Sequence, residues 1–221
     1  MSRILVVAPH PDDETLGCGG TLLKHRKDND EINWLIMTEM KPNNSNRNFI
    51  EKRNNEIKKV KKIYDFETVI QADFETAMLD SYNISEIINF ISMALDRIKP
   101  NIVYIPYAND VHSDHKIISE AFISSSKAFR KPFITSIRAY ETLSETEFNI
   151  DSTISAFKPN LFINIEKYLE KKIKIMNIYK SEVSKHPFPR SEKSLRSLAY
   201  LRGSSASLKA AESFIILKEI K

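Results

Sequence analysis

The sequence predicts a single α/β domain in which a mostly parallel sheet carries helices on both faces. Short apolar runs alternate with longer segments whose apolar residues recur at helical spacing, a pattern typical of strand–helix–strand crossovers. A length of 221 residues suits one such domain, and 42% apolar with 28% charged residues is ordinary for a globular protein. These observations favour a Rossmann-like architecture that spans residues 1–221 as one unit.

Four short apolar runs in the first half of the chain are expected to be buried strands. They occupy residues 3–8, 32–37, 68–71 and 101–106. Each is too short for a stable helix and is rich in residues that favour strands. Because right-handed crossovers bring the carboxyl ends of parallel strands to one edge, the residues after 3–8 and after 101–106 should meet there.

The segments between these runs are predicted as helices, since their apolar residues lie three or four positions apart. The predicted helices are residues 15–27, 49–64, 84–98 and 112–129. The polar segment 41–48 is rich in Asn and is expected to be a loop.

The last third of the chain is less regular. Strands are predicted at 162–165 and 213–217, and helices at 166–180 and 191–201. The segment 185–190 contains two prolines and is unsuited to a helix or a central strand. It is either a loop over the functional site or a connector.

Composition excludes several classes of protein. The single cysteine, Cys18, excludes an internal disulfide and a multi-cysteine zinc site. The net charge is +4, but the basic residues show no nucleic-acid reader motif, so runs such as Lys58-Lys59 and Lys171-Lys172 are expected to be solvated helix faces. We therefore expect no nucleic-acid partner.

No apolar segment approaches the roughly 18 to 20 residues that a membrane-spanning helix needs. The first apolar run is interrupted at Pro9, which does not fit a secretory signal. The expected location is cytoplasmic.

The segment 9–20, which follows the first apolar run directly, is the most informative of the chain. Three of the four glycines fall in it, and they are expected to form one turn: Gly17, Gly19 and Gly20. Beside that turn are one imidazole and three carboxylates: His10, Asp12, Asp13 and Glu14. Nitrogen and oxygen ligands at the carboxyl end of a strand are typical of functional sites in open α/β sheets.

A second group follows the strand predicted at 101–106. It reads Asp-Val-His-Ser-Asp-His and contains His112 and His115, which can face the same way on a first helical turn. His10, Asp13 and these histidines can supply a ligand set of two imidazoles and one carboxylate. Three protein ligands and an open position for water are typical of a catalytic zinc, beside which an unligated carboxylate can accept a proton from the water.

These two motifs resemble those of the PIG-L-like (LmbE-like) zinc N-deacetylases, which remove acetyl groups from N-acetylglucosamine-type sugars and glycoconjugates. The resemblance rests on Pro-His-Pro-Asp-Asp-Glu followed by Leu-Gly-x-Gly-Gly, and on the later His-x-Asp-His. It extends to weaker matches along most of the chain: Arg53, Glu56, Tyr140-Glu141, residues 157–160 and Arg202-Gly203.

The resemblance implies a role for each matching residue. Zinc would be held by His10, Asp13 and His115. Asp12 would be the general base, and a protonated His112 would stabilise the oxyanion while Asp114 holds its ring. The match is looser for Arg53 and Arg138, which could anchor the sugar or orient Asp12, and which are equally consistent with surface ion pairs.

The expected reaction is hydrolysis of an N-acetyl amino sugar or conjugate to acetate and a free amine. Fe²⁺ or another divalent ion could replace Zn²⁺, because histidine and carboxylate ligands do not select zinc strongly. Two alternatives remain open: a metal-dependent phosphoesterase and a non-catalytic metal- or sugar-binding module. The sequence also allows a homo-oligomer.

Overall fold

The structure, a computed structural model, describes residues 1–42 and 47–221. Positions 43–46 of the polar loop expected at 41–48 therefore lie outside the described residues. Within the described part, the strands of the sheet are β1 (Arg3–Ala8), β2 (Glu31–Glu39), β3 (Thr68–Glu75), β4 (Ile102–Pro106), β5 (Ser136–Tyr140), β6 (Leu161–Asn164) and β7 (Ala211–Glu219). The helices are α1 (Asp13–Lys27), α2 (Arg47–Tyr64), α3 (Ile84–Ile98), α4 (Ser113–Ser125), α5 (Leu169–Met176) and α6 (Glu192–Ser204).

The strands form one mostly parallel sheet in the order β3-β2-β1-β4-β5-β7-β6. Neighbouring strands from β3 to β5 pair in parallel, whereas β7 pairs antiparallel with both β5 and β6. The order of the strands reverses direction between β1 and β4. On one side of this point lie β1, β2 and β3, and on the other lie β4 and β5. In open α/β sheets, ligands bind at the carboxyl ends of the strands at such a point.

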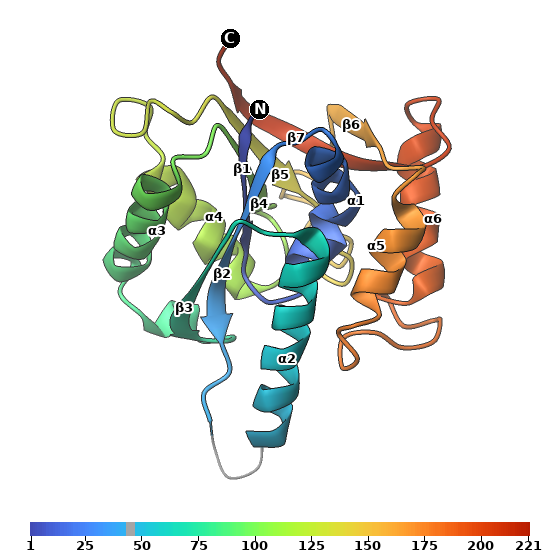
Figure 1. The fold of residues 1–221 in the computed structure, drawn as a ribbon, viewed down its shortest axis with the longest axis horizontal. Coiled ribbons are helices and arrows are strands. Elements are labelled where there is room, and N and C mark those ends of the chain that lie inside the picture. The colour runs from blue at the N-terminus through green and yellow to red at the C-terminus, as the bar shows by residue number, and fades with distance from the viewer. Residues whose placement is uncertain (43–46) are drawn as a thin grey trace.

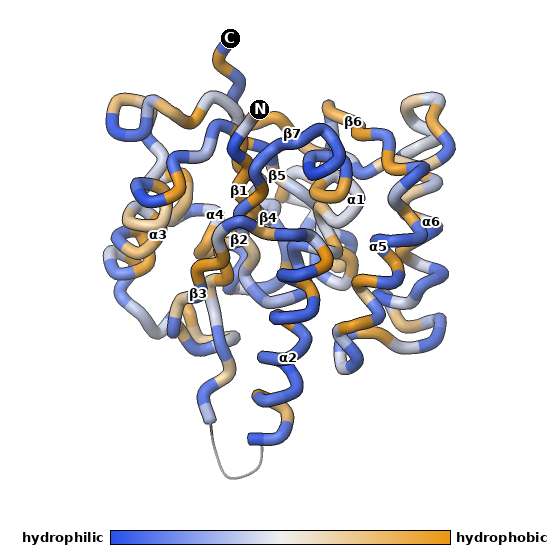
Figure 2. Tube along the Cα trace, in the orientation of Figure 1, coloured by the Kyte–Doolittle hydropathy of each residue, from blue (hydrophilic) through white to orange (hydrophobic). Residues whose placement is uncertain are grey.

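Both faces of the sheet are covered by helices (Figure 1). Alternate residues of β1 point to opposite faces: Ile4 and Val6 pack in the core that includes α1, α2, α5 and α6, and Leu5 and Val7 pack in the core that includes α3 and α4. Figure 2 shows the matching hydropathy along the chain, with hydrophobic residues along central strands such as β1 and mostly hydrophilic residues along α2. The predicted α/β architecture is confirmed.

Most predicted elements are present, with shifted ends. The helix expected at 84–98 has those bounds, and its N-cap Asn83 accepts a hydrogen bond from the Ser85 amide. The helix expected at 166–180 is shorter, because the chain leaves α5 after Met176 and Tyr179 turns into the interior. The helix expected at 112–129 ends at Ser125.

Two expectations about individual residues are wrong. The three clustered glycines do not form a turn but lie inside α1, where added side chains would collide with neighbours: a Cβ on Gly17 would lie 2.2 Å from the Tyr140 ring. Lys172 is not solvated but buried, and its Nζ lies 2.6 Å from Oε1 of buried Glu212. No helix among the described residues combines the length and the apolar character needed to cross a bilayer.

Candidate active site

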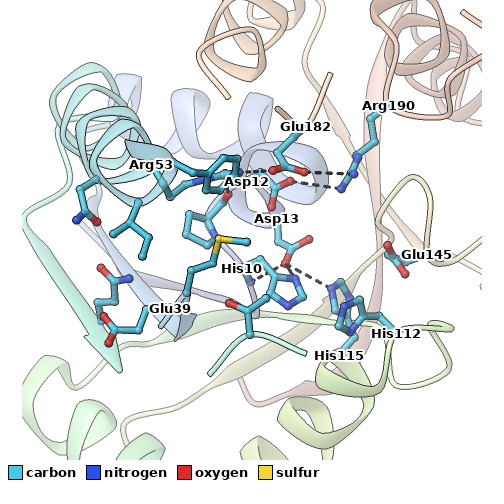
Figure 3. Close-up of a pocket in the computed structure, with 17 residues that line it drawn as sticks. His10, Asp12, Asp13, Glu39, Arg53, His112, His115, Glu145, Glu182 and Arg190 are labelled. Atoms are coloured by element: carbon cyan, nitrogen blue, oxygen red, sulfur yellow. Dashed lines mark hydrogen bonds and ion pairs between the residues drawn. The ribbon is translucent and has the colours of Figure 1, made fainter. Parts of the chain in front are cut away.

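A cavity of about 340 Å³ opens where β1 and β4 end (Figure 3). It is lined by residues from both sequence motifs, from α2 and from the last third of the chain. Its charged and titratable lining residues are His10, Asp12, Asp13, Glu39, Arg53, His112, His115, Glu145, Glu182 and Arg190. The topology thus brings together the motifs that follow β1 and β4, which are about a hundred positions apart in the sequence.

Three side chains on the cavity floor could hold a metal ion: His10, Asp13 and His115. Oδ2 of Asp13 lies 3.4 Å from Nδ1 of His10 and 3.4 Å from Nε2 of His115. Ligands at the corners of a tetrahedron around zinc are about 3.3 to 3.5 Å apart when their bonds are about 2.1 Å long. Nε2 of His115 is buried and has no hydrogen-bond partner, as expected for an atom whose partner is a cation. The residues therefore fit a divalent metal.

The far nitrogen of each of these two histidines contacts a buried carboxylate. Nε2 of His10 lies 3.0 Å from Asp114, and Nδ1 of His115 lies 2.8 Å from Asp110. Asp114 also accepts the backbone N–H groups of Ala77 and Leu79, so its carboxylate is fixed. Such outer carboxylates fix the ring orientation and leave the inner nitrogen free to bind metal.

The same contacts control protonation of the cluster. Burial alone would lower the pKa of His10, but hydrogen bonds to Asp114 and Asp13 raise it to about 9. Burial would also lower the pKa of His115, but the neighbouring carboxylates of Asp13 and Asp110 raise it to about 10. The pKa of Asp13 is well below its usual range, because both imidazoles outweigh the effect of burial. A bound cation would replace the protons on the two inner nitrogens.

Asp12 lies beside this cluster and is not part of it. Its residue is 4% exposed, and burial together with the charges of Asp13 and Glu182 raises the pKa of its carboxyl well above the usual value. Nη1 of Arg190 lies 3.6 Å from its Oδ2. The Asp12 side chain does not cap α1, so its carboxylate is available to face the cavity.

The contacts of His112 correct one expectation from the sequence. Asp114 does not hold the His112 ring with its carboxylate, which is committed to His10; instead, the backbone N–H of Asp114 donates to Nδ1 of His112 at 3.1 Å. Burial and the neighbouring charges of His10 and His115 lower the pKa of His112 to about 4. His112 is therefore a neutral imidazole that carries its proton on Nε2. The residue lines the cavity.

The two arginines singled out from the sequence lie in different places. Arg53 lines the cavity, donates to the carbonyl of Pro11 at 2.8 Å and contacts Glu182. Arg138 is not brought to this cavity: it lies within β5, and its guanidinium donates to the hydroxyl of Tyr104 at 2.8 Å. The substrate-binding role expected for Arg138 has no support from this position.

Three residues of the site are not indicated by any motif in the sequence as having a role: Asp110, Glu182 and Arg190. Asp110 lies inside the second motif, and its spacing of five residues from His115 was the only sequence signal of their contact. Arg190 ends the Pro-rich segment 185–190, and its contact with Asp12 favours the interpretation of that segment as a loop beside the site. Glu182 contacts both Arg53 and Arg190, and no sequence pattern indicated it.

Comparisons with known proteins find similar sequences and structures among deacetylases. The family model of PIG-L, described as GlcNAc-PI de-N-acetylase, matches residues 5–126. A diacetylchitobiose deacetylase from Thermococcus kodakarensis is 24% identical over 96% of this chain and 82% of its own length. The structure of an N,N'-diacetylchitobiose deacetylase from Pyrococcus horikoshii is similar over 98% of this chain and 84% of that one, with a TM-score of 0.78 and 19% identity.

The same fold is found in a protein of another activity. A 4-carboxy-2-hydroxymuconate hydratase from Pseudomonas putida KT2440 is similar over 100% of this chain and 98% of that one, with a TM-score of 0.75 and 15% identity. The fold alone therefore does not determine the reaction, which depends on the residues of the site.

Proposed function

Because this chain belongs to the PIG-L family of de-N-acetylases, we propose that it hydrolyses the acetamide of an N-acetylglucosamine-type sugar or glycoconjugate, with zinc as its metal. The enzyme is an amide hydrolase, and residues 1–221 are taken as one deacetylase domain. One observation carries the proposal: His10, Asp13 and His115 converge on the floor of a cavity with the unligated carboxylate of Asp12 beside them.

The metal would be held by His10, Asp13 and His115. Zinc bound there would polarise the acetamide carbonyl and lower the pKa of a water molecule. The donor set of two imidazoles and one carboxylate also suits Fe²⁺, which is the alternative metal. Asp114 and Asp110 orient the two imidazoles from behind.

Asp12 is proposed as the general base that takes a proton from the attacking water. Its raised pKa suits a group that must hold this proton and then return it to the leaving nitrogen. This assignment replaces the protonated His112 expected from the sequence, since a neutral imidazole is a poor proton source for the amine.

His112 is proposed to stabilise the oxyanion as a hydrogen-bond donor. Its Nδ1 accepts the Asp114 amide, so the neutral ring carries its proton on Nε2. A donor already in place where negative charge develops stabilises the transition state more than the ground state. The protein's own contribution is thus a base in Asp12 and a neutral donor in His112.

The substrate class is proposed from the relatives and from the size of the cavity. Two of the similar proteins are deacetylases of diacetylchitobiose. A cavity of about 340 Å³ lies at the lower end of the range of about 300 to 1,000 Å³ that is usual for small-molecule sites. One acetamido sugar, with any further group extending outward, suits this space.

The proposal is tested by measuring acetate release from N-acetylglucosamine, diacetylchitobiose and a conjugated N-acetylglucosamine, with protein stripped of metal and then reloaded with Zn²⁺. Zinc-dependent acetate release is expected from at least one compound, and chelator should abolish it. The matched control is His115→Ala protein treated identically. Release that is independent of metal, or no release by protein shown to contain zinc, would contradict the proposal; phosphate release from a phosphoester panel at two metals per chain would favour a phosphoesterase instead.

A further inference from the structure

Asp12 has an unusual backbone conformation for a residue with a side chain. Its φ is 146° and its ψ is −28°, on the side of φ space that normally favours glycine. It lies between His10 and Asp13, so its backbone conformation decides where its carboxylate is relative to the metal ligands. A strained conformation of this kind persists only when surrounding contacts hold it.

The peptide unit that joins Pro11 to Asp12 is held at both ends. Nη1 of Arg53 donates to the Pro11 carbonyl at 2.8 Å, and the Asp12 N–H donates to Oε2 of Glu14 at 3.0 Å. The two contacts restrain rotation of this peptide plane, which would otherwise relax the strained φ of Asp12.

Glu14 is held by hydrogen bonds of its own and lies outside the cavity. Its residue is fully buried and does not line the cavity. Its other oxygen accepts the hydroxyl of Tyr179 at 2.9 Å and that of Thr15 at 2.5 Å. Burial raises the pKa of Glu14 to about 7, and Oε2 can accept the Asp12 amide whether or not the other oxygen carries a proton.

Tyr179 connects the two restraints. Its hydroxyl donates to Glu14, and its ring lies 5.4 Å beneath the guanidinium of Arg53. Tyr179, which follows the end of α5, thus contacts both Glu14, which accepts the Asp12 amide, and Arg53, which donates to the Pro11 carbonyl.

We propose that Glu14 is a positioning residue that holds the Pro11–Asp12 peptide in its strained conformation and thereby places the Asp12 carboxylate for proton transfer. The inference rests on the proposed function in that Asp12 is taken as the base. It assigns to the glutamate of the first motif a role that is neither metal binding nor contact with substrate.

The test compares Glu14→Ala with Glu14→Gln in the full-length protein. Loss of the acceptor in Glu14→Ala should lower kcat about 10²-fold, the scale expected when a catalytic group moves by about 1 Å, with KM and zinc affinity unchanged. The amide oxygen of Gln can still accept the Asp12 N–H, so Glu14→Gln should recover most of the turnover. Equal damage in both variants, or wild-type kcat in Glu14→Ala, would overturn the proposal.

A second readout does not depend on activity. Hydrogen–deuterium exchange at the Asp12 amide, followed by ¹⁵N NMR, should be slow in the wild type and in Glu14→Gln and faster in Glu14→Ala. If the wild type releases no acetate from any substrate, the proposed function fails, but this exchange measurement still decides whether Glu14 holds the peptide. Unchanged exchange in Glu14→Ala would overturn the inference alone.

Glu212 supplies the matched control. Like Glu14, it is buried, accepts backbone amides and does not line the cavity, but the amides are those of Gly20 and Thr21 and not that of Asp12. Glu212→Gln should alter thermal stability without the selective loss of kcat. If Glu14→Ala does not fold, Tyr179→Phe tests the proposal, because it removes one hydrogen bond to Glu14 and leaves the ring under Arg53. It should speed Asp12 exchange and lower kcat, and wild-type values for both would overturn the proposal.

Discussion

Asp12 and Asp13 are adjacent carboxylates with opposite electrostatic surroundings. Asp13 lies between two imidazoles, which hold its pKa well below the usual range, whereas Asp12 faces Asp13 and Glu182, and its pKa is raised. Burial acts on both residues in the same direction, so the neighbouring charges cause the difference. The pair thereby consists of one carboxylate that stays charged, Asp13, and one that is able to take up a proton, Asp12.

Asp12→Asn should separate these two roles. The amide cannot accept a proton, so turnover should fall about 10²- to 10⁴-fold, while the cluster of His10, Asp13 and His115 remains intact and retains zinc. Acetate release and metal content would be measured on the same preparation. Near-wild-type activity would show that Asp12 is not the base, and loss of metal would show that it is a ligand.

Asp110→Asn should act on the metal through His115. Without a carboxylate at Nδ1, the imidazole is less basic and less well oriented, and the affinity for zinc should fall about 10- to 100-fold. Competition with a chromophoric chelator measures this change. Asp151→Asn, at an exposed loop position whose contacts are with neighbouring loop residues, is the control and should bind zinc as the wild type does.

The sequence predicted which residues gather in the candidate metal cluster, because His10, Asp13 and His115 belong to two local motifs. It did not predict their partners, since the contacts of Asp114 with His10 and of Asp12 with Arg190 join positions far apart in the chain. The expected contact of the Asp114 carboxylate with the His112 ring was wrong for a local reason: as N-cap of α4, His112 uses Nδ1 to accept the backbone amide of Asp114.

At the scale of elements, α1 approaches its neighbours more closely than an ordinary helix can. Gly17 faces the ring of Tyr140, which is fully buried and held by a hydrogen bond from its hydroxyl to the Val7 carbonyl at 2.9 Å. The glycine cluster therefore allows close packing of a helix, and its interpretation as a turn was wrong. A cluster of glycines in the sequence indicates that another part of the chain packs closely against them, but only the tertiary structure shows which residue does so.

Gly17→Ala should destabilise the protein despite the better helix propensity of alanine. The propensity gain is about 1 kcal/mol, but a Cβ at 2.2 Å from a fixed ring cannot be accommodated without backbone movement, so we expect a net loss of about 2 kcal/mol or more. Urea unfolding measures the difference. Asn55→Ala on the exposed side of α2 is the control and should change stability by less than about 0.5 kcal/mol. A Gly17→Ala protein as stable as the wild type would contradict the packing argument.

The last turn of α1 is tied to the sheet through His25. Its ring contacts Asp30 at 2.8 Å and the hydroxyl of Tyr104 at 3.0 Å, and burial lowers its pKa below the usual 6.5 in spite of Asp30. The unfolded chain therefore binds a proton near pH 6.5 that the folded chain does not. The stability contributed by neutral His25 is present above that pH and is lost as the pH falls.

His25→Gln should remove this dependence. Between pH 7 and pH 5, the free energy of unfolding of the wild type should fall more than that of the variant, by up to about 1.4 kcal/mol per pH unit. Urea unfolding of both proteins at the two pH values gives the difference, in which the other histidines cancel. An identical fall in the two proteins would show that His25 is not held neutral.

At the scale of the whole molecule, a buried ion pair joins distant parts of the chain. Lys172 of α5 lies 2.6 Å from Glu212 of β7 and also donates to the Leu16 carbonyl in α1, while Glu212 accepts the amides of Gly20 and Thr21. The run Lys171-Lys172 looks uniformly solvated in the sequence, because no local pattern distinguishes a lysine with a buried partner 40 positions away.

Lys172→Met should therefore be strongly destabilising. Removal of one partner leaves the other charge buried and uncompensated, which costs about 3 to 5 kcal/mol. Thermal or urea unfolding measures the loss. Lys171→Met, at the adjacent exposed position, is the matched control and should stay within about 0.5 kcal/mol of the wild type. Equal effects at the two positions would show that the buried pair contributes nothing specific.

The alternation of strands and helices, the parallel core of the sheet and the edge that carries the site were all predictable, because each follows from local periodicity and the rules of crossover connections. The position of β7 was not, since a short apolar run does not reveal that its strand enters antiparallel between β5 and β6.

The position of β7 has a consequence for synthesis on the ribosome. The strands that precede the two sequence motifs are β1 and β4, and they are synthesised about a hundred residues or more before Glu212, whose carboxylate accepts two amides of α1. A nascent chain can therefore pair its early strands long before α1, the helix that follows the first motif, receives these hydrogen bonds. Folding during translation would leave the candidate site incompletely supported until β7 inserts between β5 and β6.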